Sequence, residues 1–120
     1  MTLVRIKRHF DFLEMRDAPT KAFTKSFVLQ VRPNDKGVTR AGFTVSKKIS
    51  KLAVVRNRLR RQMREIVRLS PDLQTKYPSH DVVLIARSEA LNRDFSQLTK
   101  DFTYLLTHVH EVVDDKEVDG

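Results

Sequence analysis

The sequence predicts one domain of mixed helix and strand (α+β class), with elements in the order α-β-β-α-β-α. Three observations support this class. The chain has 120 residues, a length that suits a single domain. Short runs of alternating apolar residues predict strands, and two longer segments repeat apolar residues at helical spacing. We therefore expect one domain over residues 1–113 and an acidic, disordered tail over residues 114–120.

The first half of the chain predicts a short helix and two strands. Residues 7–16 show helical spacing, which the segment DAPT at residues 17–20 ends because proline breaks helices. Residues 25–32 (KSFVLQVR) and 39–47 (TRAGFTVSK) alternate and predict strands. The turn residues at 33–37 between them favour a hairpin. An extra strand or turn near residues 33–39 is an alternative.

The second half predicts two helices and one buried strand. The arginine-rich segment that begins at residue 53 is expected to be helical and to end near residues 70–71. Residues 81–87 (DVVLIAR) are almost continuously apolar, as expected for a strand buried on both faces. Residues 94–113 repeat apolar residues at helical intervals, so we expect a long amphipathic helix with Asn92 or Asp94 as its N-cap.

Positive charge is concentrated in one segment. Residues 47–68 contain nine bases and one acid, so this segment carries +8, which is also the formal net charge of the whole chain. The bases and acids of the other residues cancel. Such a patch attracts a polyanion. The sequence shows no membrane-spanning run and no lipidation signal, so we expect no membrane partner, and nucleic acid is the leading candidate. The lack of cysteine and of a secretory signal favours the cytoplasm.

The helix at residues 53–69 is expected to have two different faces. Val55, Leu59 and Met63 fall on one side of a helical wheel, and most of the arginines fall on the other. Arginines three or four residues apart repel each other, and bound phosphates would relieve that repulsion. The planar guanidinium also matches phosphate bidentately. The alternative is a solvated helix face that binds nothing.

No set of residues predicts a protein active site. The four histidines are not spaced as joint metal ligands, and no serine has an organised base partner in the sequence. We therefore expect no catalytic residues and no metal ligands, and a binding subunit rather than a self-sufficient enzyme.

The stretch AGFTVSKKISKLAVVRNRLRRQMREIVR resembles the bacterial ribonuclease P protein component. The family pattern is a strand with V-S-K-K, a short loop, and then A-V-x-R-N-R-x-[KR]-R-x-x-R-E. This chain carries VSKK at residues 45–48 and AVVRNRLRRQMRE at residues 53–65. It departs from the pattern at Ser50, where relatives usually have glycine, and in a loop that is one residue longer.

The resemblance implies a two-layer α/β sandwich, similar to a ribosomal-protein domain. Its central sheet would be mostly antiparallel, with a left-handed β-α-β crossover around the arginine helix. The implied function is that of the protein subunit of ribonuclease P, which promotes endonucleolytic 5′ maturation of tRNA. The RNA subunit would carry the catalysis and require Mg²⁺. The protein would bind no cofactor through its side chains and require no protein partner.

By the same resemblance, the protein has two RNA-binding surfaces. The first would hold the catalytic RNA and comprises Lys47, Lys48, Lys51, Arg56, Asn57, Arg58, Arg60, Arg61, Arg64 and Arg68. The second would be a cleft for the 5′ leader of precursor tRNA, with Phe12, Phe43, Arg40 and Ser46 as candidates. For the two phenylalanines, ordinary core packing is the alternative.

Two other functions fit the same basic segment. A general RNA-binding or ribosomal protein would bind structured RNAs without dependence on a leader. A DNA-binding module would place Arg60, Arg61 and Arg64 in a major groove and select a duplex sequence.

Overall fold

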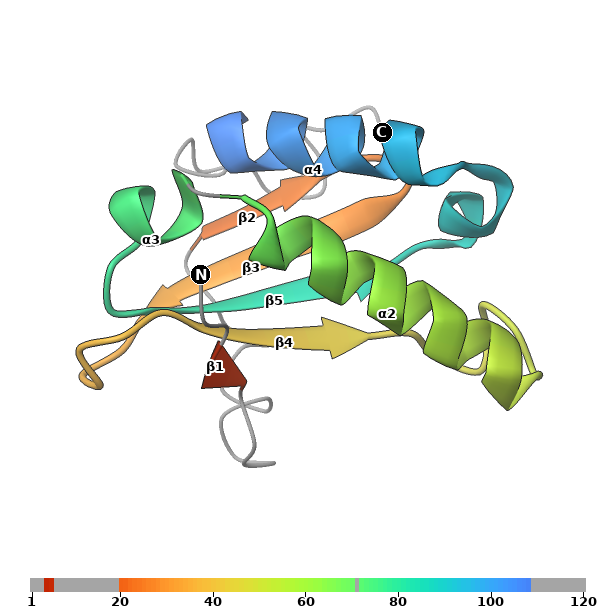
Figure 1. Ribbon diagram of the computed structural model, residues 1–120, viewed down its shortest axis with the longest axis horizontal. Coiled ribbons are helices and arrows are strands. Elements are labelled where there is room, and N and C mark those ends of the chain that lie inside the picture. The colour runs from red at the N-terminus through yellow and green to blue at the C-terminus, as the bar shows by residue number, and fades with distance from the viewer. Residues whose placement is uncertain (1–3, 6–19, 71, 109–120) are drawn as a thin grey trace.

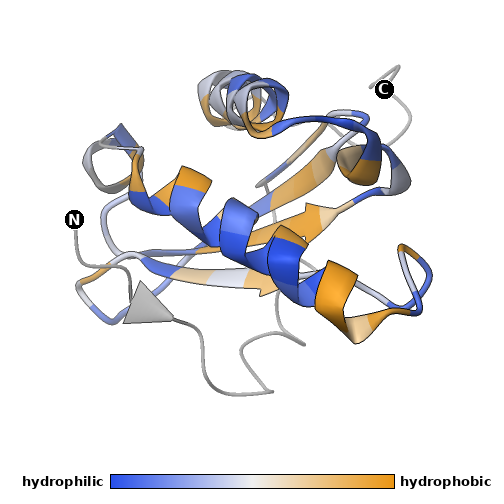
Figure 2. Ribbon diagram, turned by 45° about the vertical axis from the view of Figure 1, so that its right-hand side comes forward, coloured by the Kyte–Doolittle hydropathy of each residue, from blue (hydrophilic) through white to orange (hydrophobic). Residues whose placement is uncertain are grey.

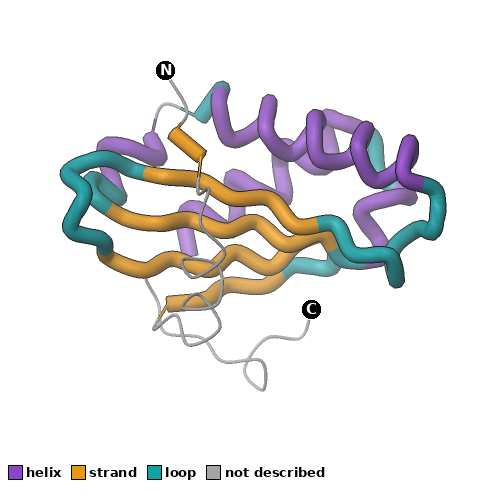
Figure 3. The backbone as a smooth tube through the Cα atoms, turned by 90° about the horizontal axis from the view of Figure 1, so that it is seen from below, coloured by secondary structure: helices purple, strands orange, loops and turns teal. Residues whose placement is uncertain are grey.

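The computed structural model describes residues 4–5, 20–70 and 72–108 and has two layers (Figures 1 and 3). One layer is a five-stranded sheet with the strand order β1-β4-β5-β3-β2. The other consists of helices that cover one face of this sheet. The two-layer α+β architecture is therefore confirmed. The strands are β1 (Val4–Arg5), β2 (Thr20–Phe23), β3 (Phe27–Pro33), β4 (Arg40–Thr44) and β5 (His80–Ala86).

The helices are α2 (Ala53–Arg68), α3 (Asp72–Lys76), the 3-10 helix η2 (Ser88–Asn92) and α4 (Phe95–His108). In the described ranges, no helix combines the length and the apolar character of a membrane-spanning segment. The expected helix over residues 7–16, the end of the last helix beyond residue 108 and the tail over residues 114–120 lie outside the described residues.

Strand β5 occupies the centre of the sheet. It pairs in parallel with β4 on one side and antiparallel with β3 on the other. Val82, Val83 and Leu84 follow one another and are each at most 2% exposed. Successive residues of a strand point to opposite faces, so both faces of β5 are covered at this point. The predicted strand buried on both faces is confirmed.

The predicted hairpin between the strands now called β3 and β4 is wrong. A turn does connect them, and Gly37 adopts φ +75°, but β5 lies between the two strands. The nearly continuous apolar run of β5 needs cover from both faces, and a central position supplies that cover better than an edge. The sheet is therefore mixed: β1–β4 and β4–β5 are parallel, and only the β2–β3–β5 half is antiparallel.

Four short elements were not expected. Strand β1 lies at one edge of the sheet and β2 at the other, α3 forms in the polar stretch before β5, and η2 follows β5. Each has five residues or fewer, so none is long enough to show a clear apolar period.

Helix α2 is confirmed, and its apolar side packs against the core. The buried residues of this side are Leu59, Met63, Ile66 and Val67. Met63 and Val67 have no exposed surface. The helix connects β4 to its parallel neighbour β5, with α3 following it in the same crossover. The left hand of this crossover stays a prediction.

Helix α4 packs beside α2 and against β2 and β3. Leu98, Phe102, Leu105 and Leu106 form its buried side. Its N-terminus is closed by a reciprocal pair of hydrogen bonds. The backbone N–H of Gln97 donates to Asp94 Oδ1 at 2.9 Å, and the N–H of Asp94 donates to Gln97 Oε1 at 3.0 Å. Of the two expected caps, Asp94 is therefore the N-cap.

Candidate nucleic-acid interface

The outer side of α2 presents a row of guanidinium groups. Arg58, Arg61, Arg64 and Arg68 are exposed, and we call these four residues the arginine face. Figure 2 shows the corresponding alternation of hydrophilic and hydrophobic turns along the helix. Within the described part of the chain, this face makes one ion pair, between Arg68 and Glu65. The other three guanidiniums remain available to an external anion.

The ion pair of Glu65 neutralises only the C-terminal end of the arginine face. Arg68 donates two hydrogen bonds to the Glu65 carboxylate, one of them from Nε to Oε2 at 3.1 Å. The hydrogen bond from Arg68 lowers the pKa of Glu65, with a smaller contribution from the charge of Arg64. The same contact raises the pKa of Arg68. Glu65 therefore stays ionised and competes with phosphate for one arginine.

Arg56 and Arg60 are half-buried and anchor the helix to the preceding loop. Arg60 donates to Asn57 Oδ1 at 2.7 Å and to the carbonyl of Val45 at 3.3 Å. Arg56 donates to the carbonyl of Ser50 at 3.0 Å. A guanidinium has five N–H groups, so each side chain keeps donors for a further partner. These two arginines fix the start of α2 to the end of β4.

The loop between β4 and α2 adds three exposed lysines, Lys47, Lys48 and Lys51. A tight turn closes it, because the N–H of Ile49 donates to the carbonyl of Ser46 at 3.0 Å. Ser50, at the position where relatives usually have glycine, accepts a hydrogen bond from the N–H of Leu52 at 3.2 Å. The first turn of α2 contains no acid, so the positive end of the helix dipole adds to the positive potential of the three lysines.

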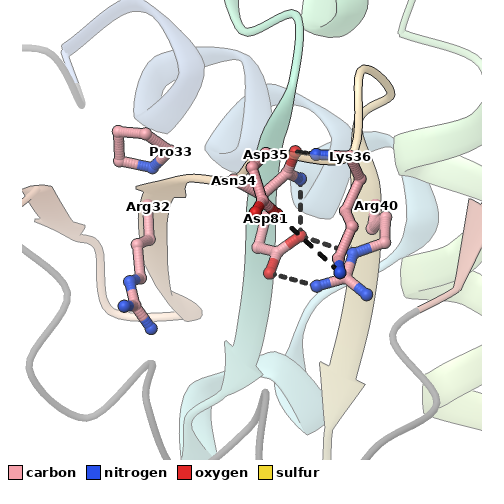
Figure 4. Close-up of a pocket in the computed structure, with 7 residues that line it drawn as sticks. All are labelled: Arg32, Pro33, Asn34, Asp35, Lys36, Arg40 and Asp81. Atoms are coloured by element: carbon pink, nitrogen blue, oxygen red, sulfur yellow. Dashed lines mark hydrogen bonds and ion pairs between the residues drawn. The ribbon is translucent and has the colours of Figure 1, made fainter.

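A second polar cluster lies at the other end of β4 (Figure 4). Arg40 holds both carboxylate oxygens of Asp81, with Nε at 2.7 Å from Oδ1 and Nη2 at 2.6 Å from Oδ2. Asn34 donates to Oδ1 at 2.8 Å. Together with Arg32 and residues 33–36, this cluster lines a hollow of about 500 Å³.

The charge state of Asp81 follows from its neighbours. Burial raises its pKa, since the side chain is only 8% exposed, but the hydrogen bonds from Arg40 and Asn34 and the charges of Arg40 and Arg32 outweigh this effect. The net result is a lowered pKa. Asp81 is thus a permanent anion that organises the cluster at neutral pH.

The described candidates for the leader cleft do not lie on one surface. Arg40 and Phe43 are three residues apart on β4, so their side chains point to opposite faces of the sheet. Phe43 is half-buried and packs against the core, whereas Arg40 pairs with Asp81 on the other face. Ser46 is exposed in the loop that follows β4. Phe12 lies outside the described residues. Phe43 therefore has a packing role, and the cleft stays a prediction.

Comparison with known proteins agrees with this geometry. A family model described as Ribonuclease P matches residues 2–110. The ribonuclease P protein component of Idiomarina loihiensis is 42% identical over 87 residues, covering 72% of this chain and 67% of that protein. The component of Citrifermentans bemidjiense is 37% identical over 95 residues, covering 79% and 78%.

Solved structures give the same result. The Staphylococcus aureus RNase P protein superposes with a TM-score of 0.75 at 26% identity, covering 94% of this chain and all of that one. The Thermotoga maritima RNase P protein also has a TM-score of 0.75, at 27% identity, covering 88% and 96%. The family match over nearly the whole chain, the shared fold and the arginine helix have one common explanation: this chain belongs to the ribonuclease P protein family.

Proposed function

We propose that this chain binds the catalytic RNA of ribonuclease P and the 5′ leader of precursor tRNA, and so promotes 5′ maturation of tRNA. Family membership supports a ribonuclease P protein component, and hence a part in an endoribonuclease complex that processes tRNA. One observation supports RNA binding most directly. The apolar side of α2 is buried in the core, while Arg58, Arg61 and Arg64 are exposed without an intramolecular ion pair to a described residue.

In this proposal the protein contributes binding and the RNA contributes chemistry. The RNA subunit, with Mg²⁺, hydrolyses the phosphodiester that joins the leader to the mature tRNA. Folding a large RNA brings many phosphates together, and bound arginines lower the repulsion between them. The exposed arginines of α2 and the lysines of the loop at residues 46–52 supply these contacts, while Arg56 and Arg60 hold the loop and the helix together.

The leader surface is assigned on the family resemblance. Phe12 would stack on an unpaired base of the leader. An alanine at this position should lower the affinity for precursor tRNA and leave the affinity for mature tRNA unchanged. Equal affinities of the folded variant and the wild type for the precursor would remove Phe12 from the leader surface.

The test of the proposal is a reconstitution with a bacterial ribonuclease P RNA and a precursor tRNA. The chain should accelerate leader removal at low Mg²⁺. Replacing Arg61 and Arg64 with glutamine should weaken binding to the catalytic RNA. It should also flatten the dependence of log affinity on log salt, by about 0.7–0.9 for each phosphate contact that is lost. Lys100→Gln is the control, since Lys100 is an exposed base on α4 that does not belong to the arginine face.

Three outcomes would contradict the proposal. The chain would fail as a ribonuclease P subunit if cleavage were no faster in its presence. Equal affinity for unrelated structured RNAs, with no effect of the leader, would favour a general RNA-binding protein. Selective binding to one duplex sequence would favour the DNA-binding alternative.

A further inference from the structure

We propose that Arg58 and Arg93 form a phosphate-binding pocket beside α2, which takes a backbone phosphate of the catalytic RNA. The inference rests on the proposed function and adds to it Arg93, a contact residue that lies outside the basic segment at residues 47–68. The pocket has a volume of about 200 Å³. Its lining residues are Val55, Arg58, Leu59, Gln62, Ala90, Leu91 and Arg93.

The lining is suited to an anion. It contains two guanidiniums and one amide, and no acid is among the lining residues. Gln62 lies one helical turn after Arg58, so their side chains occupy neighbouring positions on α2. Two arginines that face the same hollow repel each other, and a phosphate between them would remove the repulsion and accept from both. The apolar remainder of the wall suits a ribose.

The segment that carries Arg93 is firmly placed. The side chain of Ala90 is 2% exposed, and its N–H donates to the carbonyl of Arg87 at 2.9 Å. Arg87 in turn donates through its N–H to the carbonyl of Ser26 at 2.8 Å, and through Nη1 to the carbonyl of Thr24 at 3.0 Å. The segment of residues 87–93 is thus tied to the turn between β2 and β3, and the pocket wall is preformed.

Arg93 is oriented by charge and lacks a full set of hydrogen bonds. Its Nε is buried 3.7 Å from Asp101 Oδ2, and makes no hydrogen bond. The same carboxylate oxygen accepts from the hydroxyl of Ser26. Asp101 therefore positions the guanidinium without engaging all of its donors. The side chain is 30% exposed and is one of the residues that line the pocket.

Arg58 completes the site from the other side. It is exposed, and no hydrogen bond or ion pair joins it to another described residue. It also belongs to the arginine face, so the pocket is continuous with the surface proposed for the catalytic RNA. Arg40, in contrast, lies on the other side of the sheet. This continuity assigns the pocket to the catalytic RNA rather than to the leader.

The test compares variants in binding to a bacterial ribonuclease P RNA as a function of salt. Arg93→Gln should lower the affinity and flatten the log-log salt slope by about 0.7–0.9, the loss of one phosphate contact. Arg93→Lys should keep most of the slope, because it keeps the charge. Lys100→Gln should change neither quantity.

A second pair of variants leaves Arg93 and Asp101 untouched. Leu91→Glu places a carboxylate at the pocket rim, where the native side chain is 40% exposed, and should weaken RNA binding. Val38→Glu is the matched control, since Val38 is 44% exposed on the turn between β3 and β4. It should bind as the wild type does. Thermal unfolding of each variant checks that the fold is intact.

The outcomes separate this pocket from the proposed function. Folded Arg93→Gln with an unchanged slope, or Leu91→Glu that binds no worse than Val38→Glu, would overturn the pocket. The proposed function would still stand if the double substitution of Arg61 and Arg64 flattened the slope in the same assay. An unchanged slope in that double variant as well would overturn both.

Discussion

Arg40 and Asp81 face each other across the parallel pair of β4 and β5, and their side chains form a two-point ion pair at 2.7 and 2.6 Å. Asn34, from the turn after β3, donates to the same carboxylate. One buried acid thus connects three neighbouring segments, β4, β5 and the turn between β3 and β4. The pair fixes the end of the sheet opposite to the loop that leads into α2.

Asp81→Asn should lower the free energy of unfolding by about 2–4 kcal/mol, because it replaces the buried carboxylate that Arg40 and Asn34 both contact with a neutral amide. Chemical denaturation at neutral pH measures this change. Asp35→Asn is the control, since the Asp35 side chain is 93% exposed and its loss should cost less than about 0.5 kcal/mol. Equal stability of the two variants would mean that the Asp81 contacts contribute nothing net.

The same carboxylate should make stability sensitive to acid. The pKa of Asp81 is lowered in the folded chain, whereas an aspartate side chain in an unfolded chain has a pKa of about 3.9. Its contribution is therefore fully present above that value, and is lost as the pH falls through the lowered folded pKa. Denaturation between pH 6 and pH 2 should show the advantage of the wild type over Asp81→Asn shrinking below about pH 4. A constant difference across this range would contradict the assignment.

Met63 joins the arginine helix to the core and should tolerate truncation poorly. Its side chain is fully buried, so Met63→Ala should cost about 2–5 kcal/mol through lost contacts and a cavity. Val54→Ala, at a position that is 70% exposed on the same helix, should change stability by less than about 0.5 kcal/mol. Under conditions where both variants are folded, both should bind RNA like the wild type, since neither changes an arginine.

Glu65→Gln should strengthen binding to the catalytic RNA. The substitution removes the only acid from the helix and releases Arg68 from its ion pair. One additional phosphate contact would steepen the log-log salt slope by about 0.7–0.9. Asp35→Asn removes one negative charge away from α2 and serves as the charge control. The prediction fails if the two variants bind equally well.

The parts of the fold that local sequence patterns describe were predicted well. Helix α2 was expected because its apolar residues repeat over four turns, and β5 because a continuous apolar run must be covered on both faces. A cap at Asn92 or Asp94 was expected because short polar side chains precede the apolar period of α4, and the structure selects Asp94.

The strand pairing was not predictable in the same way. The turn residues between β3 and β4 show that the chain reverses there, but they do not reveal which strand lies beside which. The insertion of β5 depends on contacts between residues about 40 to 60 positions apart, for example Arg40 with Asp81 and Phe27 with Ala86. No periodicity within a single segment contains this information.

The same distinction between local patterns and distant contacts applies to the candidate sites. Arg61, Arg64 and Arg68 of the arginine face were predictable from helical spacing. Arg58 was expected beside the apolar stripe but is exposed, and Arg60 was expected on the outer face but is half-buried. Asp81 and Asn34 were missed, since nothing in the sequence shows that they meet at Arg40. Arg93 was missed because it lies outside the charged segment, and only η2 brings it to α2. A lone acid at the start of a buried strand was the one available signal for Asp81.

The central position of β5 has a consequence for synthesis of the chain on the ribosome. Strands β3 and β4 are completed by residue 44, but the strand that joins them begins only at residue 80. Until then each exposes an unsatisfied backbone edge, and α2 has only part of the surface on which it packs. A nascent chain halted before β5 should therefore remain sensitive to protease, and α2 should gain its native support only in the last third of translation.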